Sequence, residues 1–338
     1  MQNDKIAVIV YAPCVLKYDG PGAMEHSVAG IPYILNGDMI SGNHFDNLDI
    51  LSQYSHIIVN LNIDVTYLET ILRIREMLPS TVKVIGLAEG AYQDILRRDF
   101  IPECHLLMKI MQSFDAYCTI VDRSGPFYQM LTDKPVLYLG IPFWEEVSRR
   151  YRLPADVKFG STPIVAVNGV PPDALRALSR NFIGNLYLTK QSDTKVNLIT
   201  RKPIPDTVSS FMADNGFENV TVHDTTSYDK FYEIYSRCTI GINLDSLGTW
   251  GRWSLDLASM GIPVIGSIHQ QTQYMLFPDL TFDPMLDIDK AVKAYQILLD
   301  DRGFYNHCRE YALNIVGTEF ATSKFIERWN TVKCIVDS

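Results

Sequence analysis

The feature that most restricts how this chain can fold is an alternation of short apolar runs with amphipathic stretches. Residues 5–11 read Lys-Ile-Ala-Val-Ile-Val-Tyr, a nearly unbroken apolar run that is typical of a strand buried on both faces. A helix is predicted near residues 67–77, and Pro79 ends it. Strands separated by helices need crossover connections, so the pattern predicts a parallel, doubly wound α/β sheet. The other strands predicted in this half are 56–61, 82–87, 114–121 and 135–139.

The alternation stops between Arg149 and Pro163 and then begins again. We interpret this interruption as a linker, because 338 residues are too many for one ordinary α/β core. In the second half, Gly261 is predicted to end a helix in a left-handed conformation, and Pro263 prevents the helix from continuing. The strands predicted here are 164–167, 196–200, 220–223, 239–244 and 263–266, and the helices are 172–188, one near Ser209, one that follows 226–229, one that ends at Met260, 289–299 and 322–336.

Two of these helices have a readable apolar face. Residues 226–229, Thr-Ser-Tyr-Asp, resemble a capping box in which Asp replaces Glu. The side chains predicted to be buried are Phe231, Ile234 and Tyr235 in the helix that follows and Phe325, Trp329 and Val332 in the final helix.

The composition restricts the class of protein. Lys and Arg number 30 and Asp and Glu 39, which gives a net charge of −9. This balance argues against a protein whose main task is to grip a nucleic-acid backbone, but it leaves room for a local basic patch. The longest apolar stretch, residues 6–12, is far shorter than the roughly 18–20 residues of a membrane span. We expect a cytoplasmic protein with no stable membrane insertion, in which six scattered cysteines are free thiols.

The most specific motif lies in the second half. Residues 248–267 read Gly-Thr-Trp-Gly-Arg-Trp-Ser-Leu-Asp-Leu-Ala-Ser-Met-Gly-Ile-Pro-Val-Ile-Gly-Ser. Gly248 and Gly251 allow the backbone to approach a ligand closely, and the helix that follows offers N–H groups to a diphosphate. In order, spacing and chemistry, residues 220–267 resemble the donor-domain core of the family-4 retaining glycosyltransferases.

The resemblance implies the GT-B fold, in which two Rossmann-like, doubly wound α/β domains enclose an interdomain cleft. Residues 1–150 would form the acceptor domain and 163–316 the nucleotide-sugar donor domain, and the helix in 317–338 would cross back to the first domain. In the family, an acidic residue at the position of Asp256 accepts hydrogen bonds from the ribose hydroxyls; the alternative is a solvated or dipole-stabilised carboxylate in a first helical turn. The other donor-binding residues predicted in this motif are Gly248, Thr249, Gly251 and Arg252.

A second resemblance lies near the N-terminus. Residues 20–26, Gly-Pro-Gly-Ala-Met-Glu-His, are similar to the family's Gly-Gly-Ala-Glu-Arg segment, whose glycine amides approach the donor phosphates. Gly20 and Gly22 are therefore predicted to bind the donor, with an ordinary strand–helix turn as the alternative. The family's Arg and Lys pair has no counterpart at the usual offset. Arg201 and Lys202 are the cations predicted to neutralise the diphosphate instead.

The catalytic carboxylates depart from the family pattern. The first Glu of the family's Glu-x7-Glu motif would fall on Gly248, so its contact with the sugar is missing. Asp245 lies just upstream and could substitute, and Glu89 follows a predicted strand at the expected ligand edge of the sheet. Asp245 and Glu89 are the predicted catalytic residues. GT-B enzymes use no catalytic metal, so the resemblance implies no metal site and no cofactor besides the nucleotide-sugar co-substrate.

The expected function is retaining, metal-independent transfer of a hexose-type sugar from a nucleotide-diphosphate sugar, such as a UDP-sugar. One alternative is a non-catalytic protein that binds nucleotide sugars. Another is a GT-B nucleotide-sugar isomerase, whose acid and base would come from Glu89, Asp94 or His223. The acceptor stays open among a glycan, a lipid, a protein and a modified nucleic acid.

Overall fold

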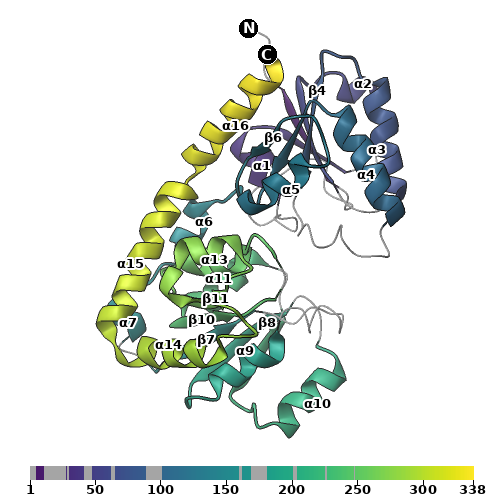
Figure 1. Ribbon diagram of the computed structural model, residues 1–338. Helices are drawn as coiled ribbons and strands as arrows, with labels where there is room; N and C mark the ends of the chain where they lie inside the picture. Colours follow the sequence, from purple (N-terminus) through teal and green to yellow (C-terminus); the bar gives the residue numbers. More distant parts are fainter. Residues whose placement is uncertain are drawn as a thin grey trace. The chain divides into compact units, whose positions relative to one another are not determined.

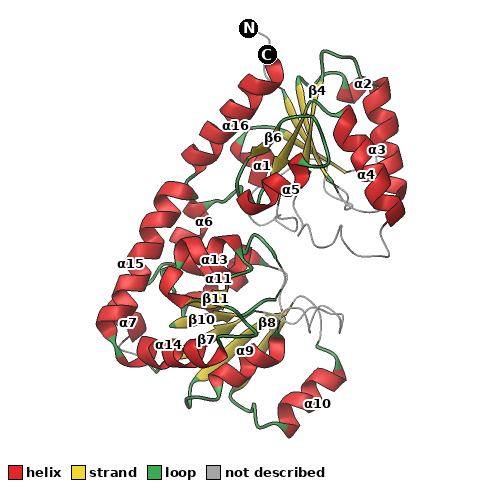
Figure 2. Ribbon diagram, in the orientation of Figure 1, coloured by secondary structure: helices red, strands yellow, loops and turns green. Residues whose placement is uncertain are grey.

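The computed structural model divides the chain into two compact α/β units (Figures 1 and 2). Unit 1 comprises Met1–Trp144 and Phe320–Ser338, and unit 2 comprises Glu145–Glu319. The sequence analysis placed the corresponding boundaries at residues 150, 163 and 317. The structure describes residues 5–10, 28, 30–41, 48–61, 65–88, 101–159, 162–168, 181–200, 204–224, 227–246 and 248–338.

Unit 1 contains a parallel sheet whose six described strands run in the order β2-β1-β3-β4-β5-β6. The five predicted strands of this half are confirmed. The sequence analysis missed β2, which is only four residues long and begins with a charged residue. The strands are β1 (Ile6–Val10), β2 (Asp38–Ser41), β3 (His56–Asn60), β4 (Lys83–Ala88), β5 (Ala116–Thr119) and β6 (Val136–Tyr138).

The main hydrophobic core of unit 1 lies between this sheet and the helices α3 (Val65–Met77) and α4 (Ile101–Ser113). Strand side chains alternate between faces, so Ala7 and Ile9 of β1 and Tyr117 of β5 point into the same layer. Figure 1 shows α3 and α4 together on one side of the sheet. The remaining described helices of this part are α1 (Gly30–Ile34), α2 (Leu48–Leu51) and α5 (Gly125–Gln129).

The last helix, α16 (Thr322–Asp337), belongs to unit 1. Its predicted buried face is confirmed, since Phe325, Trp329 and Val332 are all buried. Trp329 lies edge-on to the ring of His56, with 5.8 Å between the ring centroids. The Nε2 atom of His56 is 3.1 Å from a carboxylate oxygen of Asp337. The helix is thus joined to the first residue of β3 by packing and by a polar contact.

Unit 2 also contains a parallel sheet, and its described strands run in the order β12-β11-β10-β7-β8-β9. The first strand in the sequence, β7, lies in the interior of the sheet between β10 and β8. The predicted strands of this half are confirmed, and the two-residue β12 was missed. The strands are β7 (Ile164–Val167), β8 (Lys195–Thr200), β9 (Val220–Asp224), β10 (Ile240–Asn243), β11 (Val264–Ser267) and β12 (Thr281–Phe282).

Helices cover this second sheet, and one of them, α11 (Tyr228–Ser236), corrects the predicted face. It buries Tyr232 and Tyr235, whereas Phe231 and Ile234 are only half buried. The predicted capping box lies partly outside the described residues, and Ser227, the N-cap of α11, makes no side-chain capping hydrogen bond. The other described helices of unit 2 are α6 (Glu145–Arg149), α7 (Ala155–Phe159), α9 (Phe182–Thr189), α10 (Asp206–Asp214), α12 (Arg252–Ser259), α13 (Gln271–Leu276), α14 (Ile288–Asp300) and α15 (Arg302–Glu319).

The helix α15 was not predicted, because the side it buries includes Arg309 as well as apolar residues. Arg309 packs against Gly261, which directly follows Met260, the C-cap residue of α12. The φ angle of Gly261 is +70°, which confirms the predicted left-handed helix end. A Cβ atom at this position would lie 2.7 Å from Nε of Arg309. Conformation and close packing therefore both require glycine here.

The segment interpreted as a linker contains α7 and is packed into unit 2. Lys158 of α7 is 2% exposed. Its Nζ atom donates to the carbonyl oxygens of Ser236 at 3.0 Å and Cys238 at 3.2 Å. Burial lowers the pKa of Lys158 to about 7, because the charged ammonium loses its hydration.

Two further expectations concern the whole chain. The five described cysteines are free thiols, as predicted, and Cys14 lies outside the described residues. Of the helices that the structure describes, none has the length and apolar character needed to cross a membrane.

We expect Trp329→Ala to lower the free energy of unfolding of unit 1 by about 3–5 kcal/mol, because the deletion leaves a cavity in a packed layer. Denaturant unfolding followed by near-UV circular dichroism measures the change. Ile335→Ala, at a position of α16 that is 39% exposed, is the control and should cost much less. Equal losses for the two variants would contradict the packing described for α16.

The buried ammonium of Lys158 predicts a pH dependence of stability. The pKa in the folded state lies below that of the unfolded chain, so between pH 7 and 10 the folded state binds fewer protons and stability rises with pH. Relative to Lys158→Met, the parent should gain up to about 1.4 kcal/mol per pH unit in this window. The measurement is urea unfolding of both proteins at pH 7, 8 and 9. Parallel curves would show that Lys158 is not the titrating group.

Candidate functional site

The carboxyl ends of β7 and β10 mark the candidate site of unit 2. These two strands are neighbours in the sheet, and the chain runs from β7 to β8 and β9 on one side and to β10, β11 and β12 on the other. In open parallel sheets, ligands bind where the strand order reverses in this way. Asn168 follows β7 directly, and Asn243 is the last residue of β10.

A chain of buried amide side chains joins the two strand ends. Asn168 Nδ2 donates to Asn243 Oδ1 at 3.0 Å, and Asn243 Nδ2 donates to Gln270 Oε1 at 2.9 Å. The hydroxyl of Ser254 donates to the same Gln270 oxygen at 3.3 Å. All four side chains are buried, and each bond fixes the orientation of the next amide group. The network thereby holds α12 and the residue before α13 against the strand ends.

The predicted glycine loop, residues 248–251, runs beside the start of α13. The backbone N–H of Gln271 donates to the carbonyl of Thr249 at 3.1 Å, and that of Thr272 donates to the carbonyl of Trp250 at 3.2 Å. Thr249 also forms an isolated parallel bridge with Gln270. These backbone contacts give the loop a defined path rather than leaving it as a simple connection.

Gly251 is the N-cap of α12 and occupies the left-handed region, with a φ angle of +80°. The hydroxyl of Thr272 donates to its carbonyl oxygen at 2.7 Å. A Cβ atom at position 251 would lie 2.3 Å from the same hydroxyl oxygen. Glycine is therefore required by the backbone angle and by the contact with Thr272. These contacts lie within the protein, so the predicted role of Gly251 in binding the donor stays a prediction.

The first turns of α12 carry a buried ion pair. Nε of Arg252 lies 2.9 Å and 3.0 Å from the two carboxylate oxygens of Asp256. The hydroxyl of Tyr232, from α11, donates to Oδ1 of Asp256 at 2.9 Å. Asp256 and Tyr232 are 2% and 1% exposed. These contacts define the Arg252–Asp256–Tyr232 cluster.

Electrostatics within this cluster keep Arg252 charged. Burial alone would lower the pKa of its guanidinium, but the carboxylate of Asp256 outweighs burial and the pKa is raised. Burial, reinforced by the same carboxylate, raises the pKa of Tyr232 well above its usual value, so this phenol stays a hydrogen-bond donor. The rings of Tyr228 and Trp250 flank the guanidinium, each with its centroid 5.9 Å from Cζ.

The alternative interpretation of Asp256 is wrong. It placed a solvated or dipole-stabilised carboxylate in a first helical turn, but α12 begins at Arg252 and Asp256 lies in the second turn, buried and paired. Asp256 lies four residues after Arg252, and this spacing is also typical of exposed ion pairs on a helix surface. The sequence alone therefore does not show that Asp256 is buried. Whether Asp256 contacts a ribose stays a prediction.

The remaining predicted site residues fall into two groups. Asp245 and Gly248 follow β10, at the same edge as Asn243, and Asp245 is buried. His223 of β9 bonds to Asn197 on the neighbouring strand β8, with 3.0 Å between Nε2 and Oδ1. The predicted residues that lie outside the described part of the chain, and so stay predictions, are Gly20, Gly22, Glu89, Asp94, Arg201 and Lys202.

Three buried amides of the site, Asn168, Asn243 and Gln270, were missed by the sequence analysis. Each lies at or shortly after the end of a parallel strand, and that placement is the signal that could have found them. The motif also contains Trp250 and Trp253, two aromatic side chains that could stack on a ligand or pack in the core. Trp250 is 8% exposed, and Trp253 lies edge-on to Tyr235 with 5.7 Å between ring centroids, so both pack within unit 2.

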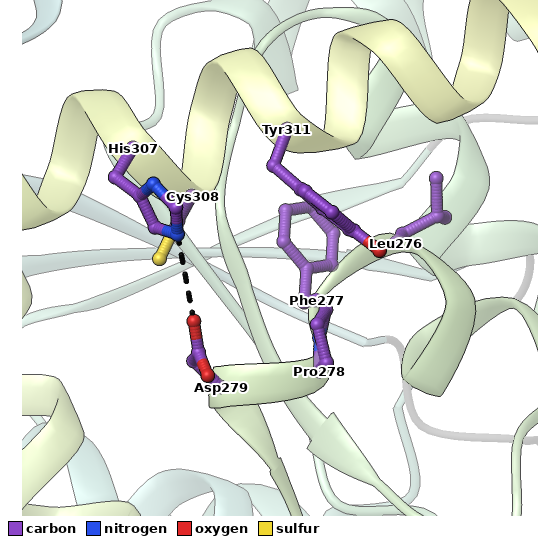
Figure 3. A pocket seen from close by; sticks show the side chains of 7 residues that line it. All are labelled: Leu276, Phe277, Pro278, Asp279, His307, Cys308 and Tyr311. Atoms are coloured by element: carbon purple, nitrogen blue, oxygen red, sulfur yellow. Dashed lines mark ion pairs between the residues drawn. The ribbon is translucent and has the colours of Figure 1, made fainter.

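Two other features of the described residues bear on ligands. No group of three or more His, Cys, Asp or Glu side chains within them could hold a metal ion. A small cavity of about 110 Å³ lies between the end of α13 and α15 (Figure 3). It is lined by Phe277, Tyr311 and an exposed pair, Asp279 and His307, with 3.6 Å between Oδ2 and Nε2. Its volume is well below the roughly 300 Å³ at which small-molecule sites begin.

Comparison with known proteins gives a match by structure alone. No family model and no curated protein matches the chain. An alpha-glucosyltransferase in complex with UDP and a 13-mer DNA containing a central A:G mismatch superposes with a TM-score of 0.67 at 12% identity, covering 98% of this chain and 100% of that one. A sucrose-phosphate synthase from Thermosynechococcus elongatus gives 0.68 at 13% identity, with 98% and 100% covered. TarM gives 0.64 at 11% identity, with 85% and 55% covered.

The chain has the GT-B fold. The predicted pair of doubly wound, Rossmann-like sheets is confirmed. At identities of 11–13% the likeness concerns the fold and does not transfer the activity of any neighbour.

The buried ion pair predicts that Asp256→Ala lowers the free energy of unfolding by about 3–5 kcal/mol, because Arg252 is left buried without its carboxylate. Tyr232→Phe removes one hydrogen bond to a charged group and should cost about 1.5–3 kcal/mol. Asp229→Ala, an exposed carboxylate on α11, is the matched control and should cost less than about 1 kcal/mol. Urea unfolding measures all three. A loss for Asp256→Ala no larger than that of the control would mean that the pair does not stabilise the fold.

Proposed function

We propose that the chain is a glycosyltransferase that moves a sugar from a nucleotide-diphosphate sugar to an acceptor hydroxyl. The observation that carries the proposal is the likeness along nearly the whole chain to structures named alpha-glucosyltransferase, one of them in complex with UDP-glucose and DNA containing an abasic site. The motif in residues 248–267 supports the same activity independently of that likeness.

In this proposal the donor diphosphate binds at the start of α12. The N–H groups of a first helical turn lie outside the intrahelical ladder and attract anions. Gly248, Thr249 and Gly251 bring backbone to the phosphates, and Arg252 supplies a cation. Asp256 accepts from Nε of the guanidinium and Tyr232 donates to Asp256, so the direction of the guanidinium is set before the donor binds. Asp256 also remains our candidate for the ribose hydroxyls.

Catalysis would rest on electrostatic stabilisation of the leaving diphosphate. Negative charge grows on the diphosphate as the sugar leaves, and fixed N–H groups and cations stabilise it most in the transition state. Arg201 and Lys202 stay candidate cations for the phosphates, and Gly20 and Gly22 stay candidate donor-binding residues. Asp245 would contact the sugar in place of the carboxylate that is missing at Gly248, and Glu89 would bind the acceptor.

The finer features belong to the same proposal. We infer that transfer proceeds with retention, because the motif is similar to a retaining family, and that it needs no metal. The five described free thiols support a reducing, cytoplasmic location. The acceptor class stays open among a glycan, a lipid, a protein and a modified nucleic acid.

One observation favours a second candidate, a non-catalytic protein that binds nucleotide sugars. The position of the first carboxylate in the family's Glu-x7-Glu motif is Gly248, so a group that normally contacts the sugar is missing. Binding of the nucleotide would survive this loss, because the start of α12 and Arg252 are intact. An isomerase has weaker support, since His223 lies on the edge strand β9 and bonds to Asn197.

The test is a thermal-shift panel of UDP-, GDP-, ADP- and dTDP-sugars, followed by measurement of nucleotide release. A donor at 100 times its dissociation constant should stabilise the protein by about 2.7 kcal/mol. The proposed enzyme should also release the nucleoside diphosphate slowly when water replaces the acceptor, and chelation of metal ions should not stop it. Asp245→Asn should lower this rate with little change in donor affinity, and Asp229→Asn is the surface control.

Three outcomes separate the readings. Binding with slow release, sensitive to Asp245→Asn, supports the transferase. Tight binding without release supports the binding protein, and conversion of the sugar without release supports the isomerase. The absence of a shift with every donor would overturn the proposed site at α12.

A further inference from the structure

The side chain of Asn168 lies at the point of unit 2 where the strand order reverses. Asn168 directly follows β7, and the residue before it pairs with Ile242 of β10 and with Leu198 of β8. One position further along the same register, Asn168 lies between Asn243 and Ile199. Neighbouring residues in register on parallel strands share a face of the sheet, so these three side chains form one row at the carboxyl ends of the strands.

The amide of Asn168 is used at one end only. Nδ2 donates to Oδ1 of Asn243 at 3.0 Å, but Ile199, on the other side, has no polar side-chain atom to offer. Oδ1 of Asn168 has no partner among the described residues, yet it is not one of their fully buried unpartnered atoms, so it keeps accessible surface. Asn168 is 9% exposed, whereas Asn243, whose amide is bonded at both ends, is 1% exposed.

The hydrogen-bond network fixes the direction of this oxygen. Because Nδ2 of Asn168 faces Asn243, the carbonyl of the same planar amide points away from Asn243. Asn243 donates to Gln270, which also accepts from Ser254 of α12. Three hydrogen bonds thus connect the amide at the end of β7 to the helix at which the donor diphosphate is proposed to bind. A polar group that is oriented in advance loses less entropy when it binds a ligand.

The chemistry of an amide oxygen restricts the group that it can bind. Oδ1 only accepts hydrogen bonds, and the diphosphate of a nucleotide sugar has no proton to donate at neutral pH, so the partner must be a hydroxyl or an N–H group. Asp245, the candidate for contact with the transferred sugar, lies two residues after Asn243. Asp256, the candidate for the ribose, lies in the second turn of α12. This placement favours a hydroxyl of the transferred sugar over one of the ribose.

We propose that Asn168 determines donor specificity, and that its Oδ1 atom accepts a hydrogen bond from a hydroxyl of the transferred sugar. This inference rests on the proposed glycosyltransferase function and adds a residue to its donor site. The substrate class is a nucleotide sugar whose hydroxyl at this position is free, because an acylated or methylated oxygen has no proton to donate. A nucleoside diphosphate lacks this hydroxyl, so the contact contributes to binding of the nucleotide sugar alone.

The experiment compares Asn168→Leu with Asn168→Asp, because both new side chains are close in size to asparagine. Both variants lose the donation to Asn243, so any damage to the network is common to the two, but only Asn168→Asp keeps an acceptor oxygen. Titration calorimetry gives the dissociation constants of UDP-glucose, GDP-mannose, ADP-glucose and dTDP-glucose, each beside that of its own nucleoside diphosphate. The melting temperature of each variant checks that it is folded.

The measured quantity is the affinity for the nucleotide sugar relative to that for its nucleoside diphosphate. Asn168→Leu should lower this ratio about tenfold, the equivalent of one hydrogen bond of about 1.4 kcal/mol. Asn168→Asp should leave the ratio near that of the parent, because repulsion between the new carboxylate and the diphosphate acts on both ligands alike. Asn197→Leu is the matched control and should not change the ratio. Asn197 lies on the same face of the sheet, in β8, and its amide is bonded at both ends, to Cys238 and His223.

Three results would overturn the inference although the parent binds a nucleotide sugar. The ratio is unchanged in Asn168→Leu; Asn168→Asp lowers it as much as Asn168→Leu does, so that the network rather than the oxygen is required; or Asn197→Leu lowers it equally. If the parent binds none of the four nucleotide sugars, the proposed transferase is overturned and the inference with it. The two failures are distinguishable, because only the first leaves a parent protein that binds nucleotide sugars.

Discussion

The constraint on which the structure depends is that parallel strands cannot be joined by tight turns. Each connection must cross over one face of the sheet, so helices cover the faces and the interior strands are buried on both sides. All strands of a sheet then end at one edge, where the chain turns into loops and helix starts. In unit 2 this edge brings together Asn168, Asn243 and the residues that lead into α12. The possible ligand positions follow from the connectivity.

Burial at this edge turns polar groups into a rigid framework. In water an arginine and a carboxylate four residues apart on a helix would contribute little, because solvent screens them. Enclosed by α11 and the loop before α12, Arg252 and Asp256 cannot regain hydration if they separate, so each depends on the other. The amide network from Asn168 to Gln270 acts in the same way on the loop. The contacts that stabilise unit 2 are therefore the same ones that orient the groups proposed to bind the phosphates.

Much of this fold could be predicted from the sequence, because continuous apolar runs such as residues 6–10 have few ways to be buried. The prediction failed where burial depends on a polar group. The inner side of α15 includes Arg309, which a hydrophobic pattern counts as exposed, and Tyr232 is drawn into the interior of unit 2 by its bond to Asp256. The motif indicated where the site lies, but not that Asp256 is already paired. Local sequence carries no information on contacts between α11 and α12.

Polar residues at the strand ends of this fold are of two kinds. At the ends of β7 and β10, each buried amide meets another, and the hydrogen-bond network holds the loops in place. At the ends of β5 and β8, the buried hydroxyls of Thr119 and Thr200 have no hydrogen-bond partner among the described residues. An unpaired buried hydroxyl costs free energy, so these two threonines lower the stability of the strand ends where the amides raise it. The difference lies between single side chains and a connected network, and it occurs in both sheets.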